Sequence, residues 1–385
     1  MTKFKYIIIG GGMAGDMAAR GIREHDEEGT IALFSSEEFP PYDRPPLTKG
    51  LWIAGDTVED IDRETKDLGV EIFLNSEVIK IDRDEHHITT RSGEVFEYER
   101  LLLATGGSPR RFQSGPPEII YYRYRTDFEH LKREATATKQ VSVIGGGYIG
   151  SEIAAALAAN GHEVTMFFPE KGLLGRILPE EIAEFVSSEF TRNGITLHPE
   201  STVRSIERPD RFKIQLESGS VFETDIVIAG LGIIPNIQLA HDAGLLTSNG
   251  IEVNEFMQTS DPDIFAAGDV ANIYNPSLGI RRRVEHEQNA NRTGKLAGLA
   301  MAGAPKSIGD FLPMFYSDAF DISWEGVGEV SANMEHHIVW EEPFKVGAIY
   351  YLTDGYVRGA IMWNQWGKLK EVRSLIRSGK RFLPG

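Results

Sequence analysis

Two glycine-rich turns in this chain of 385 residues have the residue types and the spacing that bind dinucleotide phosphates. In each turn the first glycine permits a tight bend, the second lets the backbone approach a pyrophosphate, and the last lets a helix pack on a strand. The following helix would present its N-terminal amides and dipole to the anion. The positions concerned are Gly10, Gly12, Ala14 and Gly15 in the first turn and Gly145, Gly147, Tyr148, Ile149 and Gly150 in the second.

An acidic residue follows the second predicted strand after each turn. Strand 30–34 leads to Glu37, and strand 163–168 leads to Glu170. At this distance a carboxylate accepts hydrogen bonds from the ribose of an adenosine. Glu170 would repel a 2′-phosphate, so the second site favours NADH, and the nearby Arg176 keeps NADPH open as the alternative.

The elements around the turns have the expected periodicity. Apolar runs at 6–9 (YIII) and 141–144 (VSVI) are typical of buried parallel strands, and each runs directly into its glycine turn. A helix is predicted over 151–160. A further helix over 179–193 has its apolar residues on one face and ends at Gly194, which indicates a packing role.

The composition limits both the chemistry and the partners. The chain has no cysteine, so neither a disulfide nor a thiolate can relay electrons, and no metal site is predicted. The net charge of −17 argues against binding to nucleic acid or to an anionic membrane. No apolar run reaches the ~18 residues that span a bilayer and no signal peptide precedes the first strand, so we expect a cytoplasmic protein.

Further turns follow buried strands in a fixed order. These are ATGGSP at 104–109, LGIIPN at 231–236 and IFAAGD at 264–269. Together with the glycine turns, they resemble the FAD-dependent pyridine nucleotide–disulfide oxidoreductase superfamily over essentially the whole chain. The missing cysteines exclude the disulfide branch of this superfamily. The segment 41–49 (PYDRPPLTK) resembles the non-disulfide branch, which contains ferredoxin and rubredoxin reductases, monodehydroascorbate reductases and apoptosis-inducing factor.

The resemblance implies an α/β fold with two Rossmann-like dinucleotide-binding domains, for FAD and NAD, and a smaller C-terminal α+β domain. Residues 1–112 and 243–303 would form the two parts of the FAD-binding domain. Residues 113–242 would form the NAD(H)-binding domain, and 304–385 the C-terminal cap. The cofactors expected are FAD and NADH, with NADPH as the less favoured alternative.

The resemblance also implies site residues. Lys49 would lie near N5 of the flavin and pair with Glu152, with an ordinary surface pair as the alternative, and Arg44 would also lie against FAD. His286 would contact the flavin, with a packing histidine as the alternative. Further cofactor contacts are expected at Ala104, Thr105, Gly106, Gly232, Gly268, Asp269, Glu285 and Trp324. For Trp324 a place in the core of the small domain is the alternative.

The implied activity is transfer of a hydride from NADH to N5 of FAD, and then of electrons to an acceptor without a disulfide relay, as in ferredoxin and rubredoxin reductases. The acceptor of such enzymes is a small acidic redox protein, ferredoxin or rubredoxin, and its binding usually needs a positive docking patch. Arg281–Arg283 is the local candidate for that patch. A small-molecule acceptor such as a quinone, dioxygen or an ascorbyl-like radical is an alternative, as is a redox-sensing interaction protein resembling apoptosis-inducing factor. A homodimer also stays open.

The segment 315–324 (FYSDAFDISW) bears on the acceptor because it resembles monodehydroascorbate reductase. That family has an arginine for the ascorbyl radical where this chain has Asp318. An anion beside an anionic substrate should repel it. We therefore expect the ascorbyl radical to be a poor substrate.

Overall fold

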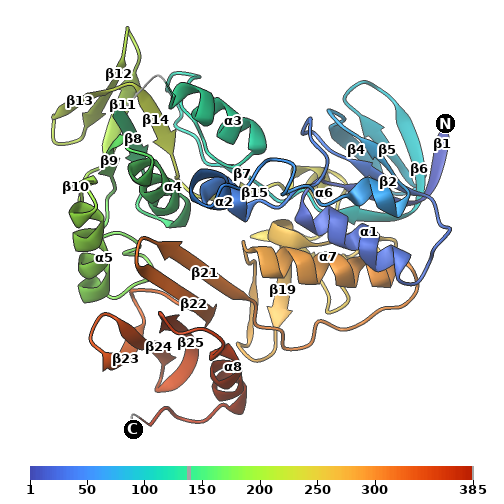
Figure 1. Ribbon diagram of the computed structural model, residues 1–385. Helices are drawn as coiled ribbons and strands as arrows, with labels where there is room; N and C mark the ends of the chain where they lie inside the picture. Colours follow the sequence, from blue (N-terminus) through green and yellow to red (C-terminus); the bar gives the residue numbers. More distant parts are fainter. Residues whose placement is uncertain (137–139, 384–385) are drawn as a thin grey trace. The chain divides into compact units, whose positions relative to one another are not determined.

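The computed structural model describes residues 1–136 and 140–383, and the chain divides into two compact units (Figure 1). The first unit contains 1–44, 58–108 and 234–313. The second contains 45–57, 109–233 and 314–385. The predicted boundaries of the FAD, NAD and cap domains stay a prediction.

The first unit is built on a sheet with the strand order β3-β2-β1-β6-β5-β4, in which β18 also pairs with β6. The central strand β1 runs parallel to β2 and β6, and Ile9 lies opposite Phe34 and Leu103. The carboxyl ends of these strands therefore meet where the first glycine turn begins. The strands are β1 (Thr2–Ile9), β2 (Ile31–Phe34), β3 (Val70–Phe73), β4 (Val78–Asp82), β5 (His87–Thr90), β6 (Val95–Leu103) and β18 (Ile264–Ala266).

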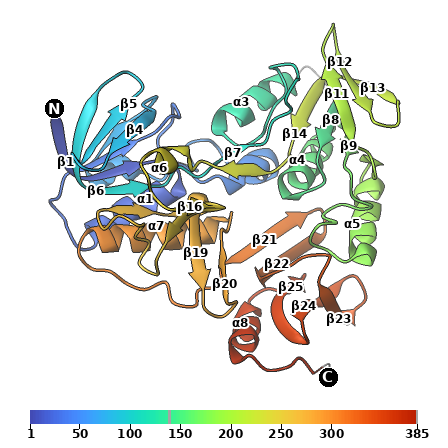
Figure 2. The same ribbon diagram turned by 180° about the vertical axis from the view of Figure 1, so that it is seen from behind.

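Helices α1 (Met13–Arg23) and α7 (Glu287–Met301) of this unit lie side by side in both views (Figures 1 and 2). Small residues allow the close approach. A Cβ on Gly294 would lie 2.3 Å from the Ala14 oxygen, and a Cβ on Gly298 would lie 2.1 Å from the Ala18 oxygen. Helix α7, which lies far along the chain, thus packs against the helix that follows the first glycine turn.

The rest of the first unit is a smaller sheet, β16-β17-β19-β20, with short helical segments. Its elements are η2 (Thr65–Leu68), α6 (Gln238–Asp242), β16 (Thr247–Ser248), β17 (Gly250–Val253), η3 (Gly268–Val270), β19 (Ala271–Asn275) and β20 (Ile280–Arg282). Two further short strands, β7 (Gly107–Pro109) and β15 (Ile233–Pro235), lie where the chain passes from one unit to the other.

The second unit contains a parallel sheet with the order β10-β9-β8-β14. Ile144 at the end of β8 lies opposite Phe167 and Ala229, which repeats the arrangement of the first unit at the second glycine turn. These parallel strands and their helices confirm the predicted α/β class. The elements are α3 (Arg125–Glu134), β8 (Gln140–Ile144), α4 (Tyr148–Ala159), β9 (Glu163–Phe167), α5 (Glu180–Arg192), β10 (Thr196–His198) and β14 (Ile226–Ala229).

Two antiparallel sheets complete the second unit, one with the order β11-β12-β13 and one with the order β21-β22-β25-β24-β23. Helix α8 packs against β22 and β25 of the larger sheet (Figure 1). The elements are η1 (Pro45–Thr48), α2 (Gly50–Ile53), β11 (Val203–Glu207), β12 (Phe212–Leu216), β13 (Val221–Thr224), β21 (Met314–Ala319), β22 (Ile322–Gly328), β23 (Glu335–Glu342), β24 (Val346–Thr353), β25 (Tyr356–Trp363) and α8 (Leu369–Ser378).

Candidate functional site

The first glycine turn has the geometry of a phosphate cradle. Gly10 has a φ of +127°, and a Cβ there would lie 2.1 Å from the Ala104 oxygen, so only glycine fits. A Cβ on Gly15 would lie 2.2 Å from the Gly10 oxygen. Gly12 stands at the start of α1 without a side-chain cap, and the nearest atom to a Cβ there belongs to the Arg44 guanidinium, 3.6 Å away. The turn, the helix start and the guanidinium suit the pyrophosphate of a dinucleotide.

Glu37 in the same unit is held in a defined orientation. The Arg44 Nη2 donates to Glu37 Oε1 at 2.6 Å, and the Tyr42 hydroxyl donates to Glu37 Oε2 at 2.6 Å. A carboxylate oxygen accepts more than one hydrogen bond, so Glu37 keeps acceptor capacity for ribose hydroxyls.

The second glycine turn repeats this construction in the second unit. Gly145 has a φ of +112°, and a Cβ there would lie 2.3 Å from the Gly230 oxygen. A Cβ on Gly150 would lie 2.1 Å from the Gly145 oxygen. By contrast, a Cβ on Gly147, the residue before α4, would meet no atom within 4 Å. The open backbone face lies at the position that approaches a pyrophosphate, so this turn also fits a dinucleotide.

Glu170 follows β9 and forms an ion pair with Arg176 at 2.5 Å. The side chain of Arg176 is 81% exposed, whereas that of Glu170 is 21% exposed. The two residues that the sequence associates with opposite nucleotide preferences are therefore in direct contact.

Lys49 and Glu152, predicted as a pair, are brought together in the second unit. The Lys49 ammonium lies 3.3 Å from Glu152 Oε1 and 3.2 Å from Asp318 Oδ1. It also lies 4.2 Å from the centre of the Tyr316 ring, a cation–π contact. The ammonium is thus held by two carboxylates and one aromatic face.

Glu152 is itself buried and anchored. Thr48 Oγ1 donates to Glu152 Oε2 at 2.7 Å, and Ser317 Oγ donates to Oε1 at 2.9 Å. Burial raises the pKa of the Glu152 carboxyl, although the Lys49 charge and the two hydroxyls oppose this rise. An ordinary exposed surface pair would have none of this support, so we infer that the pair is built into the core of the unit.

Sequence reasoning missed Thr48 and Ser317. Each is a polar residue directly next to a singled-out charge, Lys49 or Asp318, and both are buried. Adjacency to a charged residue in the sequence predicts such a role only weakly, because the fold alone brings the two hydroxyls together at Glu152.

Other predicted residues have structural contacts of their own. His286 caps α7, with Nδ1 accepting from the Gln288 amide at 3.2 Å. Thr105 donates to the Asn236 oxygen at 2.8 Å. Trp324 is 1% exposed and lies 5.4 Å from the Tyr148 ring, measured between centroids.

The remaining predicted positions lie in turns. Three of them are glycines with positive φ, namely Gly106, Gly232 and Gly268. Ala104 directly follows β6, Asp269 lies in η3, and Glu285 forms an ion pair with Arg283 at 2.6 Å. Contact of all these residues with a cofactor stays a prediction.

The arginine cluster Arg281–Arg283 is largely committed to its own unit. Arg281 donates to the Val253 and Asn272 oxygens, and Arg283 donates to the Asp269 oxygen. Two of the three arginines therefore stabilise the backbone, and the cluster is a weaker docking candidate than its sequence indicates.

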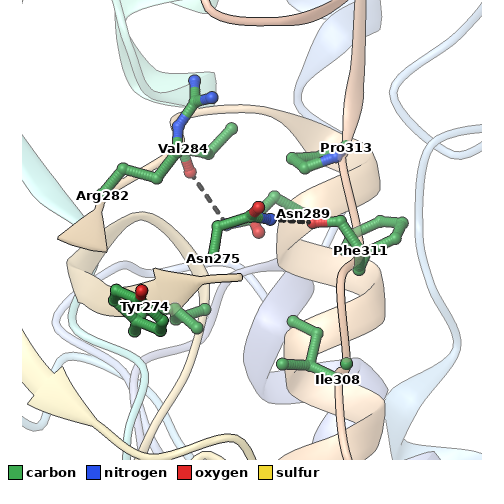
Figure 3. Close-up of a pocket in the computed structure, with 10 residues that line it drawn as sticks. Tyr274, Asn275, Arg282, Val284, Asn289, Ile308, Phe311 and Pro313 are labelled. Atoms are coloured by element: carbon green, nitrogen blue, oxygen red, sulfur yellow. Dashed lines mark hydrogen bonds between the residues drawn. The ribbon is translucent and has the colours of Figure 1, made fainter. Parts of the chain in front are cut away.

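A cavity of about 20 Å³ lies beside the start of α7 (Figure 3). Asn275 donates to the Phe311 oxygen and Asn289 to the Val284 oxygen, each at 2.9 Å. The volume suits about one water molecule, so this cavity is no dinucleotide site. In the described parts of the chain, no helix is long and apolar enough to cross a membrane and no group of metal-binding side chains occurs.

Two parallel-strand units, each with a glycine turn, a helix start and a carboxylate after its second strand, define a protein that binds two dinucleotides. The chain belongs to the pyridine nucleotide-disulphide oxidoreductase family, whose model matches residues 4–294. It is an FAD-dependent pyridine nucleotide oxidoreductase. The resemblance inferred from the motifs is thereby confirmed.

Curated relatives include proteins of all three kinds named by the resemblance. Apoptosis-inducing factor 1, mitochondrial, of Dictyostelium discoideum is 34% identical over 98% of this chain and 79% of that protein. The 5,5'-dehydrodivanillate O-demethylase ferredoxin reductase subunit of Sphingobium sp. is 33% identical over 99% and 95%. Monodehydroascorbate reductase 3 of Arabidopsis thaliana is 32% identical over 97% and 92%.

Solved structures show the same fold. The putidaredoxin reductase–putidaredoxin complex has a TM-score of 0.91 at 28% identity, covering 98% of this chain and 94% of the matched chain. The ferredoxin reductase for the CYP199A2 system from Rhodopseudomonas palustris has a TM-score of 0.89 at 29% identity, covering 98% and 96%.

Proposed function

We propose that this protein is an NADH-dependent reductase that passes electrons from FAD to a small ferredoxin-type protein. The observation that carries the proposal is the absence of cysteine, because electrons cannot leave through a disulfide. The relatives named as ferredoxin reductases support the acceptor class.

In this proposal each glycine turn has its own nucleotide. The turn at Gly10 and the oriented Glu37 hold FAD, and the turn at Gly145 with Glu170 holds NADH. FAD, when bound, can accept an electron pair and release the electrons one at a time. The protein supplies Lys49, whose fixed ammonium favours negative charge on a neighbouring group.

A panel of acceptors tests the function. Purified flavoprotein is mixed with NADH, and NADH oxidation is followed with a ferredoxin, a rubredoxin, a quinone or dioxygen as the acceptor. We expect rapid bleaching of the flavin and fastest turnover with the ferredoxin. Slow turnover with every acceptor, together with a persistent long-wavelength charge-transfer band, would instead identify a redox sensor.

Replacing Glu170 by alanine should erode the preference for NADH. The change removes the ribose acceptor and releases Arg176, an exposed cation able to pair with a 2′-phosphate. We expect the NADH/NADPH ratio of kcat/KM to fall roughly tenfold, about 1.4 kcal/mol. The double variant Glu170→Ala, Arg176→Ala should bind NADPH less well than the single variant. An unchanged ratio in the single variant would remove Glu170 from the ribose site.

Asp318→Arg should increase activity toward an ascorbyl-type radical, the alternative acceptor that the relatives from Arabidopsis thaliana bring forward. Asp318 is 43% exposed and places a negative charge beside Lys49. This carboxylate repels an anionic substrate. The variant Asp318→Asn separates the effect of losing the carboxylate from the effect of gaining the guanidinium. Reduction of a neutral quinone controls for changes in activity that do not depend on the charge of the acceptor. Equal radical-reduction rates in all three proteins would show that Asp318 does not select the acceptor.

A further inference from the structure

The segment 170–178 lies between β9 and α5 in the second unit and borders both parts of the predicted nucleotide site (Figure 1). Its Leu174 amide donates to the Gly146 oxygen, within the second glycine turn, at 2.7 Å. The segment also carries Glu170, the predicted ribose acceptor, and Arg176, which forms an ion pair with it. The conformation of one short segment therefore positions this carboxylate and supports the turn.

The backbone of this segment is strained at Leu174. Its φ is +58°, in the left-handed region that a residue with a side chain enters only at a cost in free energy. Residues 170–178 form turns and bends, with no helix or strand to fix them. A leucine keeps such a conformation only where the surrounding structure holds it. The contacts of this segment thus decide whether it keeps its shape.

The C-terminal antiparallel sheet provides two of these contacts. The hydroxyl of Tyr351 in β24 donates to the Ile177 oxygen at 2.7 Å, across 174 positions of the sequence. The Ala332 amide, in the connection between β22 and β23, donates to the Arg176 oxygen at 3.0 Å. Tyr351 is fully buried, and burial raises the pKa of its hydroxyl, which therefore stays protonated and remains a donor. Two consecutive carbonyls of the segment are thus bound from this sheet.

The hydroxyl of Tyr351 goes beyond what packing requires. A phenylalanine ring would fill the same place in the core, whereas the hydroxyl directs one hydrogen bond to one carbonyl of the segment. The same sheet also contacts the start of α4, where the Trp324 ring of β22 lies 5.4 Å from the Tyr148 ring, measured between centroids. The sheet therefore contacts both the helix start after the glycine turn and the segment that carries Glu170.

We propose that Tyr351, together with the Ala332 amide, is a positioning residue for the nicotinamide nucleotide, because it holds 170–178 in the shape that presents Glu170 to the ribose. The inference rests on the proposed function, which assigns NADH to the turn at Gly145. A segment that is ordered before binding loses little conformational freedom when the nucleotide arrives, so its contacts contribute fully to affinity. A segment released from the sheet would lose that freedom on binding instead.

Two variants release the segment one hydrogen bond at a time. Tyr351→Phe keeps the buried ring and removes the hydroxyl donor. Ala332→Pro removes the amide donor, and Ala332 is the second residue of a turn in which the Met334 amide donates to the Ser331 oxygen at 3.0 Å. Proline is favoured at that position of a β-turn, so the turn should keep its shape. The double variant Tyr351→Phe, Ala332→Pro removes both bonds.

The control Tyr121→Phe makes the same chemical change elsewhere in the unit. The Tyr121 hydroxyl accepts from the Phe112 amide at 3.1 Å, and Tyr121 is buried like Tyr351. The affinity of the intact flavoprotein for ADP-ribose is measured by calorimetry, and exchange of the amide hydrogens of 174–178 is followed without nucleotide. KM and kcat for NADH are measured with ferricyanide, a one-electron acceptor, and thermal unfolding reports stability.

We expect each single variant to bind ADP-ribose about threefold to fivefold more weakly, and the double variant about tenfold or more, because the segment must then be ordered on binding. The KM for NADH should rise by similar factors while kcat changes less than about twofold. The amides of 174–178 should exchange faster in the double variant. The control should change the ADP-ribose affinity less than about twofold, because it leaves the segment in place.

The possible failures are distinct. Wild-type ADP-ribose affinity and a wild-type KM for NADH in the double variant, whatever its unfolding temperature, would overturn the positioning role and leave the proposed function standing. Weaker ADP-ribose binding by the variants of a protein whose wild type does not reduce ferredoxin would support the positioning role and contradict the proposed function. ADP-ribose affinity that neither the double variant nor Gly147→Val changes would contradict the nucleotide site and the positioning role together.

Discussion

Gly147→Val is expected to leave the fold intact and to weaken NADH binding by roughly 100-fold, about 2.7 kcal/mol. Gly147 has extended backbone angles that valine adopts, and a Cβ there meets no protein atom within 4 Å. The added side chain would therefore begin in the open space through which a pyrophosphate approaches the backbone. Calorimetry with ADP-ribose and thermal unfolding without nucleotide measure the two effects separately.

Gly161→Ala provides the opposite pattern. Gly161 follows α4 with a φ of +83° and open space around it, so alanine there should cost about 1 kcal/mol of stability and leave nucleotide affinity unchanged. Gly147→Val should lose less than about 1 kcal/mol of stability, because valine differs from glycine there mainly in being less favoured at the N-cap position of a helix. Normal ADP-ribose binding by Gly147→Val would contradict a dinucleotide at this turn.

Lys49→Met is expected to destabilise the protein by about 3 kcal/mol at neutral pH, because it leaves the buried Glu152 carboxylate without its cation. Lys49 is 17% exposed and Glu152 is 8% exposed, so water replaces the ammonium poorly. If Lys49 also lies against the flavin, the variant should bind FAD more weakly or be reduced more slowly by NADH. Denaturant unfolding and stopped-flow reduction test the two roles independently.

The pH dependence of this variant has a defined sign. The pKa of Glu152 is already raised by burial, and removing Lys49, the largest opposing influence, should raise it further. Protonation then favours the folded state. The loss of stability in Lys49→Met is therefore largest above the folded pKa and disappears as pH falls below the unfolded value of about 4.3.

A second substitution identifies the cause. Glu152→Gln added to Lys49→Met keeps the size of the side chain while removing the charge. One of the Thr48 and Ser317 hydroxyls still donates to the amide oxygen, and the other turns to accept from the amide nitrogen. The double variant should recover part of the lost stability and lose the pH dependence. Asp318 is the other carboxylate at Lys49, but it is 43% exposed and should contribute less. If the single and double variants unfold alike at every pH, the buried charge is not the cause.

The sequence by itself determined the two glycine turns, the strands before them and the acidic residues after them. These features are local: a positive φ at Gly10 or a backbone contact at Gly150 is required wherever that strand-turn-helix unit forms. Periodicity likewise predicted the helix over 179–193, which the structure shows as α5 (Glu180–Arg192). The count of zero cysteines excluded a disulfide relay without any structure.

Only the tertiary structure decided which distant residues share a site. Lys49, Glu152 and Asp318 come from three segments, and their ion pairs depend on how η1, α4 and β21 pack. The hydroxyls on Glu152 were missed because a lone threonine or serine has no periodicity to reveal it. The role of Arg281 was likewise decided by the fold, because the Val253 and Asn272 oxygens that accept from its side chain lie elsewhere in the sequence. Spacing along the chain encodes local geometry, whereas partners across the fold are chosen by packing.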